Sequence, residues 1–532
     1  MLEKPSIHRL LQDAKRAMNA GQLKNSHQLC LQILEQQRNH PEAHYLLGMN
    51  AFLRKDLKRA ETLLKRAIDF DHTPLRFYLY LCRTYLAQQN QANALNVLHL
   101  ANTINTENPH EWDTLGVLNA NVNQHRRALM CFQKAVQREP KNTEYLYNLA
   151  TSSRINGQLD EAIIACKQII TLQPNFYRAY SLMAQLRKAT QDANHIALLE
   201  RQLTLATDTT ARLHFSHALF LELESLNNYE KAFHYLEHGK TQQKTTISYD
   251  LNWDLNLFKT VQELCNKNFL ENRSEVRVPR GTRQPIFVLG MPRSGTTLLD
   301  RILSNHSQIE SLGERLDFPI AFKQVASSPS KLVLDEATIQ QSSTIDYSQL
   351  GQNYYHRLNA FLPNSAFFID KLPLNFFYIG YIYKALPHAK IIVLQRNPLD
   401  LCISNYKQLF AANFSYYNYA YDLKDCARYI VEFHRLMDHW RNLIPKDRLI
   451  EVQYENLVSN TEQEAKRAVE FINLPWQENC LHFDKNTAPV ATASATQVRQ
   501  PIYHSSVGAW RNYEFALDEV KSLFDEAGIA YQ

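Results

Sequence analysis

Hydrophobic positions in the first half of the chain follow helical spacing, in pairs of segments that recur at a fixed interval. The frame starts at Ile7, Pro41, Leu75, Pro109 and Thr143, which is a period of about 34 residues. Each frame places small residues where its two segments would meet. The pattern predicts an array of paired helices in which each pair packs mainly on its neighbours.

The copy that begins at Pro109 is the clearest. Gly116 in its first helix lets the second helix approach closely at Ala128, because a small residue leaves room for the neighbouring helix. The full set of matching residues is Trp112, Leu115, Gly116, Ala128, Phe132, Ala135 and Pro140. This pattern resembles the tetratricopeptide repeat, and the resemblance covers about residues 7–246, with a degenerate frame at Tyr177. It implies an α-helical solenoid that holds a protein or peptide; an architectural spacer or dimerisation arm is the alternative.

The period is lost over residues 247–283, which we interpret as a junction that ends in the basic residues Arg277, Arg280 and Arg283. A short apolar run at residues 285–289 then predicts a buried strand. It leads into the loop Gly290-Met-Pro-Arg-Ser-Gly-Thr-Thr and the helical segment LLDRILSNH. A strand, a glycine-containing loop and a helix N-terminus form a cradle for anions, because backbone N–H groups and the helix dipole point at the bound oxygens.

The spacing of Gly290 and Gly295 matches the phosphate loop of ATP-using enzymes, but Thr296 stands where those enzymes have lysine. An ATP-using enzyme needs that lysine at the β- and γ-phosphates. A nucleotide kinase is therefore the weaker interpretation.

A second predicted strand, residues 389–395, is followed by Arg396 and, two helical turns on, by Ser404. An arginine fork and a hydroxyl at this spacing can face one phosphate. The alternative is that Arg396 caps a surface loop.

The loop PRSGTTLL and the segment RNPLDLCIS resemble the 5′-phosphosulfate and 3′-phosphate motifs of sulfotransferases, in the form of the tyrosylprotein sulfotransferases and their bacterial relatives. The resemblance implies that residues 284–532 form an α/β domain with a P-loop-like parallel sheet. It also implies 3′-phosphoadenosine-5′-phosphosulfate (PAPS) as co-substrate and no metal. The residues that it implies for PAPS binding are Arg293, Ser294, Gly295, Thr296, Thr297, Arg396, Ser404, Tyr454 and Ser494. Tyr454 has a core role as its alternative, and Thr496 is the alternative to Ser494.

The same resemblance assigns catalytic roles. Gly313-Glu314 matches the pair that supplies the base, and Lys371 with Arg293 would stabilise charge on the transferring group. His306 is a lower-ranked candidate base. The alternative for Glu314 is a structural ion pair with Arg293 or Arg315.

Composition changes this picture little. The 532 residues are 45% hydrophobic and 21% charged, with a net charge of +5, which is typical of a globular protein and gives no sign of nucleic-acid binding. No apolar run suggests a membrane span or signal peptide. The eight cysteines are scattered, which favours a cytoplasmic protein without structural zinc; Cys30 and Cys166 occupy core positions of the repeat frame.

The sequence thus predicts an enzyme that moves the sulfuryl group of PAPS to a hydroxyl, with a protein tyrosine as the favoured acceptor. A glycan or small-molecule hydroxyl is the alternative acceptor. A non-catalytic repeat scaffold is the alternative from another functional class.

Overall fold

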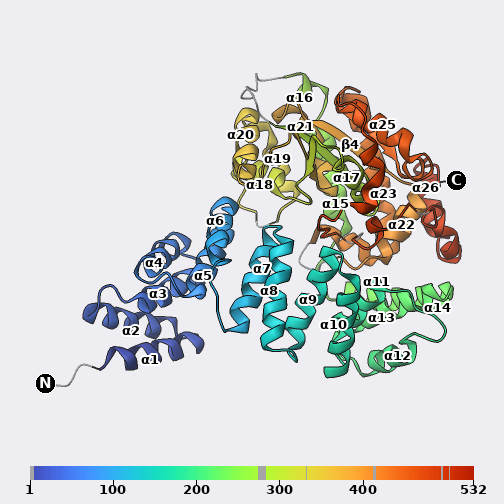
Figure 1. The fold of residues 1–532 in the computed structure, drawn as a ribbon. Helices are drawn as coiled ribbons and strands as arrows, with labels where there is room; N and C mark the ends of the chain where they lie inside the picture. The colour runs from blue at the N-terminus through green and yellow to red at the C-terminus, as the bar shows by residue number, and fades with distance from the viewer. Residues whose placement is uncertain are drawn as a thin grey trace. The chain divides into compact units, whose positions relative to one another are not determined.

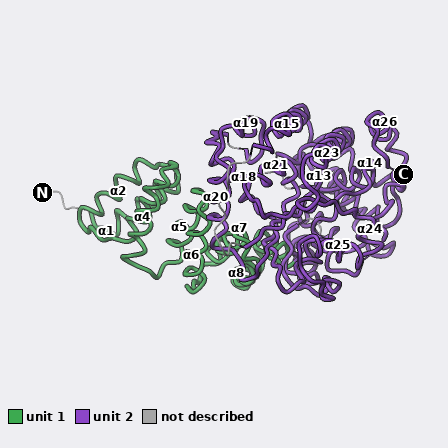
Figure 2. Tube along the Cα trace, turned by 90° about the horizontal axis from the view of Figure 1, so that it is seen from above, with its two compact units in different colours: residues 1–153 green, residues 154–532 purple. Residues whose placement is uncertain are grey.

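The computed structural model describes residues 5–272, 283–330, 332–410, 415–492, 495–502 and 504–531. The chain divides into two compact units, residues 1–153 and residues 154–532 (Figure 2). Arg277 and Arg280 of the predicted junction lie outside the described residues. The limits 7–246, 247–283 and 284–532 came from sequence pattern, and they stay a prediction.

The first unit consists of helix pairs (Figure 1). Its helices are α1 (Ile7–Asn19), α2 (Leu23–Gln36), α3 (Pro41–Leu53), α4 (Leu57–Phe70), α5 (Leu75–Ala87), α6 (Gln91–Ala101), α7 (Pro109–Asn121) and α8 (His125–Arg138); α9 (Thr143–Asn156) runs across the limit between the units. The first helix of every pair begins at the residue where the predicted frame begins. The repeat period is therefore confirmed.

Close packing between the helices of a pair explains the small residues of the frame. A Cβ atom at Gly48 would lie 2.7 Å from the Leu64 side chain, and one at Gly116 would lie 2.6 Å from the Phe132 ring. These distances are shorter than a carbon–carbon contact allows. Cys30, at the frame position of Leu64, is fully buried, as the frame predicts.

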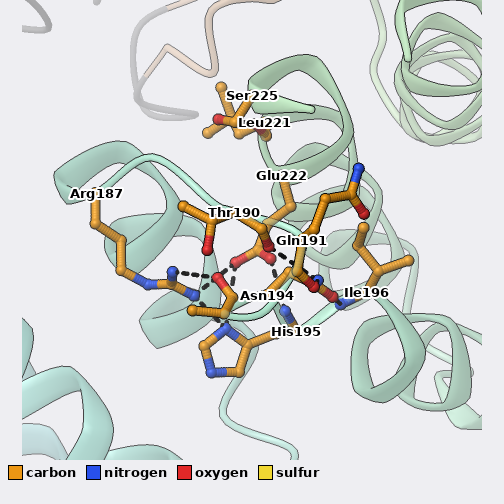
Figure 3. Close-up of polar contacts among 10 residues, drawn as sticks. Arg187, Thr190, Gln191, Asn194, His195, Ile196, Leu221, Glu222 and Ser225 are labelled. Atoms are coloured by element: carbon orange, nitrogen blue, oxygen red, sulfur yellow. Dashed lines mark hydrogen bonds and ion pairs between the residues drawn. The ribbon is translucent and has the colours of Figure 1, made fainter. Parts of the chain in front are cut away.

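The helical array continues in the second unit with α10 (Leu159–Leu172), α11 (Tyr177–Leu186), α12 (Ile196–Leu205), α13 (Thr209–Ser225) and α14 (Tyr229–Lys244). The segment between α11 and α12, where the frame is degenerate, is held by a polar network (Figure 3). The buried Glu222 carboxylate accepts hydrogen bonds from Arg187 Nη2 at 3.1 Å and from the His195 backbone N–H at 2.6 Å. These contacts compensate the cost of burying the carboxylate.

The second unit also contains a five-stranded sheet in the order β2-β3-β1-β4-β5, in which all pairings are parallel. The strands are β1 (Gln284–Gly290), β2 (Ile309–Ser311), β3 (Phe367–Lys371), β4 (Lys390–Gln395) and β5 (Leu449–Gln453). Because β1 is central, the loop that follows it opens at the carboxyl edge of the sheet beside the ends of β3 and β4.

Both faces of the sheet are covered, as a parallel sheet requires. Ile286 and Val288 pack into a core cluster on one face, and Phe287 and Leu289 pack into a cluster on the other. The first cluster is completed by α17 (Thr296–Leu303), α24 (Tyr454–Ser459) and α25 (Thr461–Phe471). The second is completed by α15 (Leu251–Leu264), α16 (Lys267–Glu271), α18 (Asp317–Val325), α19 (Glu336–Gln340), α20 (Tyr347–Leu358), α21 (Ile379–Ala385), α22 (Pro398–Lys407), α23 (Leu423–Leu443) and α26 (Asp518–Glu526). The predicted fold class, a helical solenoid and a parallel-sheet α/β domain, is confirmed.

The last helices of the array share a core with the sheet. Phe220 of α13 and Phe233 of α14 belong to the same hydrophobic cluster as Phe258, Phe376 and other side chains that cover the sheet. The fully buried Lys240 of α14 donates hydrogen bonds to the carbonyl oxygens of Gln408 at 3.1 Å and Ala420 at 2.6 Å. These helices are therefore an integral part of the second unit.

None of the helices in the described part of the chain combines the length and apolar character needed to cross a bilayer.

Candidate functional site

The loop after β1 approaches its neighbours so closely that two of its positions require glycine. Gly290 has φ +145°, and a Cβ atom there would lie 2.5 Å from the Leu394 carbonyl oxygen of β4. Gly295, at φ +104° directly before α17, would place a Cβ atom 2.5 Å from the Tyr454 ring. Any larger residue would clash and also be strained at these dihedral angles. The glycines thus hold the loop against β4 and Tyr454, directly before the N-terminus of α17, and the N–H groups of a helix N-terminus suit an anion.

Arg293, Arg396 and Ser404 lie together beside this loop. Arg396 follows β4 and donates from Nη1 to the Arg293 carbonyl oxygen at 2.8 Å. Ser404, on α22, accepts a hydrogen bond from Arg293 Nε at 3.4 Å. The structure therefore brings the arginine and the hydroxyl of the second motif to the arginine of the first, 111 residues apart in the chain.

Tyr454 joins the same cluster. The Arg396 guanidinium lies 4.7 Å from the centre of the Tyr454 ring, a cation–π contact. The Tyr454 hydroxyl hydrogen-bonds to Ser506 Oγ at 2.7 Å, and Arg396 Nη2 donates to the Ser506 carbonyl oxygen at 2.7 Å. Ser506 was not among the residues predicted from sequence, although it lies in the same C-terminal stretch, residues 486–513, as Ser494.

The C-terminal stretch reaches the loop at further points. Gln497 Oε1 accepts a hydrogen bond from Arg293 Nη2 at 2.8 Å, and the hydroxyls of Thr492 and Thr297 lie 3.3 Å apart. Ser494 lies outside the described residues. Sequence reasoning missed Gln497, because nothing in its neighbours indicates which residue of the stretch meets Arg293.

Two buried polar atoms at this site have no partner among the residues that the structure describes. They are Ser294 Oγ in the loop and Arg396 Nε at the end of β4. A buried polar atom without a hydrogen bond is costly, so such atoms at a functional site indicate a missing ligand oxygen. Thr296 and Thr297 are also buried, at the first turn of α17. A hydrogen-bond donor set of this kind suits phosphate or sulfate.

Glu314 and Lys371 form an ion pair on the other side of β1. Lys371 ends β3 and is paired in register with Val288 of β1. Its Nζ lies 2.6 Å from Glu314 Oε1; the lysine side chain is 1% exposed and that of the glutamate 37%. Glu314 thus pairs with Lys371, whereas Arg315 pairs with Asp317 at 2.7 Å.

Other groups lie within reach of this pair's charges. Burial raises the pKa of the Asp300 carboxyl, and the Lys371 charge opposes that rise. Burial, and after it the charge of Glu314, raises the pKa of both the Tyr416 and the Tyr417 hydroxyls. Tyr417 also stacks on Phe410, with 4.3 Å between ring centres. The carboxylate therefore has aromatic side chains in its surroundings.

His306 is occupied by backbone groups on both ring nitrogens. Its Nδ1 accepts from the Gln308 N–H at 3.1 Å, and its Nε2 lies 2.9 Å from the Pro475 carbonyl oxygen. Because Nδ1 acts as an acceptor, Nε2 carries the hydrogen and donates it to Pro475. The side chain is also buried, at 1% exposure. This arrangement suits a structural histidine and leaves Glu314 as the better-placed base.

Two arginines of the C-terminal stretch, Arg499 and Arg511, have partners of their own. Arg499 donates from Nη2 to the carbonyl oxygens of Ile155 at 3.0 Å and Ala488 at 3.2 Å. Arg511 is exposed and stacks on Trp510, 4.7 Å from the ring centre.

Comparisons with known proteins agree with this geometry. The model of the sulfotransferase family matches residues 285–478. This part of the chain is therefore similar to the sulfotransferase family. Models of the tetratricopeptide repeat match residues 11–73 and 131–164. The predicted combination of a repeat array and a sulfotransferase domain is confirmed.

Three similar proteins show the range of sequence identity and coverage. An uncharacterized protein of Aquifex aeolicus (strain VF5) is 30% identical over 79% of this chain and 56% of its own length. Protein-tyrosine sulfotransferase 1 of Danio rerio is 26% identical over 40% of this chain and 60% of its own length. The solved sulfotransferase domain from the curacin biosynthetic pathway is 16% identical, with a TM-score of 0.33 over 47% of this chain and 100% of its own. The chain therefore spans less than two thirds of the length of the first two.

Proposed function

We propose that this chain transfers the sulfuryl group of PAPS to a hydroxyl, and that a protein tyrosine is the acceptor. The observation that carries the proposal is that Arg293, Arg396 and Ser404 lie together beside the loop between β1 and α17. The Glu314–Lys371 pair lies on the other side of β1. One side of β1 thus offers cations and hydroxyls for a nucleotide, and the other offers a carboxylate and a lysine for chemistry.

The nucleotide half of the proposal rests on the donor set. The N-terminus of α17, Ser294, Thr296, Thr297 and Arg293 would hold the 5′-phosphosulfate. Arg396, Ser404 and Tyr454 would hold the 3′-phosphate side, as in the family that the motifs resemble. The unpartnered Ser294 Oγ and Arg396 Nε support this assignment, because an anion would supply both with acceptors.

The chemical half rests on the ion pair. Glu314 would take the proton of the attacking hydroxyl, and Lys371 and Arg293 would stabilise the charge that builds on the transferring group and on the leaving phosphate. When Glu314 becomes protonated, its attraction for Lys371 falls. The lysine can then donate more fully to the developing charge, so the pair links proton removal to charge stabilisation. No step in this scheme needs a metal ion.

Three observations support an aromatic hydroxyl as acceptor. The charge of Glu314 contributes, after burial, to the raised pKa of the Tyr416 and Tyr417 hydroxyls, so two aromatic side chains lie near the candidate base. Several similar proteins, from Danio rerio and Drosophila melanogaster among others, are named protein-tyrosine sulfotransferases. Repeat arrays of this kind offer an extended concave surface that can bind a peptide. We place the reaction in the cytoplasm, because all eight cysteines are free and buried.

Two measurements test this proposal. Calorimetry should give tight binding of 3′,5′-diphosphoadenosine and no comparable binding of ATP with Mg²⁺. Transfer of radiolabelled sulfate from PAPS should label a tyrosine peptide and leave the matched phenylalanine peptide unlabelled. Binding of ATP with Mg²⁺ but not of 3′,5′-diphosphoadenosine would favour a kinase. Labelling of a serine peptide or a glycan, with the tyrosine peptide unlabelled, would show that tyrosine is not the acceptor.

A further inference from the structure

The C-terminal stretch contacts the repeat array at the turn between α9 and α10. Arg499 Nη2 donates to the Ile155 carbonyl oxygen at 3.0 Å, and the Val490 N–H donates to the same oxygen at 2.9 Å. Ile155 is the penultimate residue of α9. The Ile155 carbonyl oxygen therefore accepts hydrogen bonds from two residues of the C-terminal stretch.

Gly157 in this turn makes the contact possible. It has φ +83°, and a Cβ atom there would lie 2.7 Å from the central carbon of the Arg499 guanidinium. The guanidinium therefore occupies the space that any side chain at this position would fill. Glycine at this position permits the positive φ of the turn and leaves space for the Arg499 guanidinium.

The other side of the same stretch contacts the candidate nucleotide site. Gln497 lies in the short 3₁₀ helix η5 (Gln497–Arg499), and its Oε1 accepts from Arg293 Nη2 at 2.8 Å. Arg301 of α17 donates to Asn486 Oδ1 at 2.6 Å and to the Ala488 carbonyl oxygen. Because Gln497 and Arg499 belong to a single turn of helix, a shift of that turn moves both residues.

We propose that the α9–α10 turn of the repeat array holds Arg293 in its anion-binding orientation, through Arg499 and Gln497 as positioning residues. An arginine side chain has many rotamers, and two of its donors are directed here by Gln497 and Ser404. Fixing the guanidinium before the ligand arrives lowers the ordering cost of binding. A guanidinium is a planar group with several N–H donors, which suits it to bind oxygen atoms of phosphate or sulfate.

The inference rests on the proposed function in one respect, namely that Arg293 binds the 5′-side anion of the nucleotide. It adds that the repeat array contributes to nucleotide affinity without touching the nucleotide. The array thereby has a physical connection to the site, since movement of the α9–α10 turn changes the position of Arg293.

The test uses the full chain and calorimetry with 3′,5′-diphosphoadenosine. Gly157→Ala should displace Arg499 and weaken binding about tenfold, the loss expected when a charge-assisted contact is misplaced. Gln497→Ala should weaken it to a similar extent. Affinity for 3′-AMP, which lacks the 5′-phosphate, should not change. The matched control is Gly21→Ala, because Gly21 has φ +72° and no atom within 4 Å of the added Cβ.

A double-mutant cycle separates positioning from a general structural effect. If Gly157 acts through Gln497, adding Gly157→Ala to Gln497→Ala should cost no further affinity. Additive losses, equal losses for 3′-AMP, or tighter binding by Gln497→Ala would overturn the inference. Should Gly157→Ala not fold, Arg499→Met replaces it in the same cycle. Failure of the unaltered chain to bind either nucleotide would instead refute the proposed function, and the inference with it.

Discussion

Replacing Glu314 by glutamine tests the assignment of the base most directly. The glutamine keeps the size of the side chain and an oxygen that can accept from Lys371 Nζ, which lies 2.6 Å from the present carboxylate. It removes the negative charge and the ability to take a proton. Because the structure pairs Glu314 with Lys371 rather than with Arg396 or Ser404, nucleotide affinity should not change.

The expected sizes of the effects differ strongly. Removal of a general base lowers turnover by about 10²–10⁴-fold. The effect on stability should be about 1 kcal/mol or less, because Glu314 is 37% exposed and water screens its pairing with the buried Lys371. The interaction of the Lys371 charge with the Asp300 carboxyl, which opposes the rise of the Asp300 pKa caused by burial, also remains in the variant. A loss of turnover in this range would therefore be chemical in origin and would not arise from unfolding.

The assay is single-turnover sulfate transfer from PAPS to a series of phenols of decreasing pKa. A more acidic phenol needs less help from a base, so it should partly rescue Glu314→Gln. Lys371→Met removes charge stabilisation instead and should stay impaired across the series, by about 10²–10³-fold. Glu310→Gln, four residues earlier and exposed, is the matched control and should behave as the unaltered chain does. Equal rescue of both variants, rescue of neither, or a turnover change of Glu314→Gln below about threefold would refute the reasoning.

Three further predictions concern binding, folding and pH. Arg396→Ala or Ser404→Ala should cost about 1.5–3 kcal/mol of affinity for 3′,5′-diphosphoadenosine by calorimetry; an equal loss for 5′-AMP would contradict a role at the 3′-phosphate. Residues 247–532 alone should show no cooperative thermal unfolding by circular dichroism, because the deletion removes Phe220 and Phe233 from the core of the second unit; a cooperative transition would contradict a shared core. Burial raises the pKa of Asp370 from its usual 3.8 to about 7. As the pH rises, the unfolded chain therefore loses the Asp370 proton before the folded chain does. The stability that the protonated carboxyl contributes is complete below about pH 3.8 and is lost as the pH rises to about 7. Asp370→Asn should therefore gain stability over the unaltered chain in denaturant titrations across that range, and a constant difference between the two would contradict the shifted pKa.

Much of the fold followed from local pattern. The period of the repeat predicted the starts of α1, α3, α5, α7 and α9 without error, because each helix pair packs on its neighbours and repeats the same local requirements. The run at residues 285–289 predicted the strand before the phosphate loop, since a strand buried on both faces is apolar throughout.

The site was predictable only in part. Glycines at 290 and 295 and arginines at 293 and 396 carry strong sequence signals, because few residue types meet the backbone and anion-binding requirements of such a loop. Ser506 and Gln497 carry no such signal. Their contacts depend on how the C-terminal stretch packs, and a serine or glutamine in an irregular segment is compatible with many environments.

By itself, the sequence determined the kinds of element and the chemistry that each motif can perform: a helical array, a parallel sheet, and cations and hydroxyls suited to phosphate and sulfate. Only the tertiary structure decided three things, namely the pairing of Glu314 with Lys371, the occupation of both His306 nitrogens by backbone groups, and the inclusion of α13 and α14 in the core of the second unit. The reason is physical. Helix period and loop glycines express short-range steric rules. Apart from the local hydrogen bond between Gln308 and His306, these contacts join residues that are far apart in the chain and depend on the packing of the whole unit.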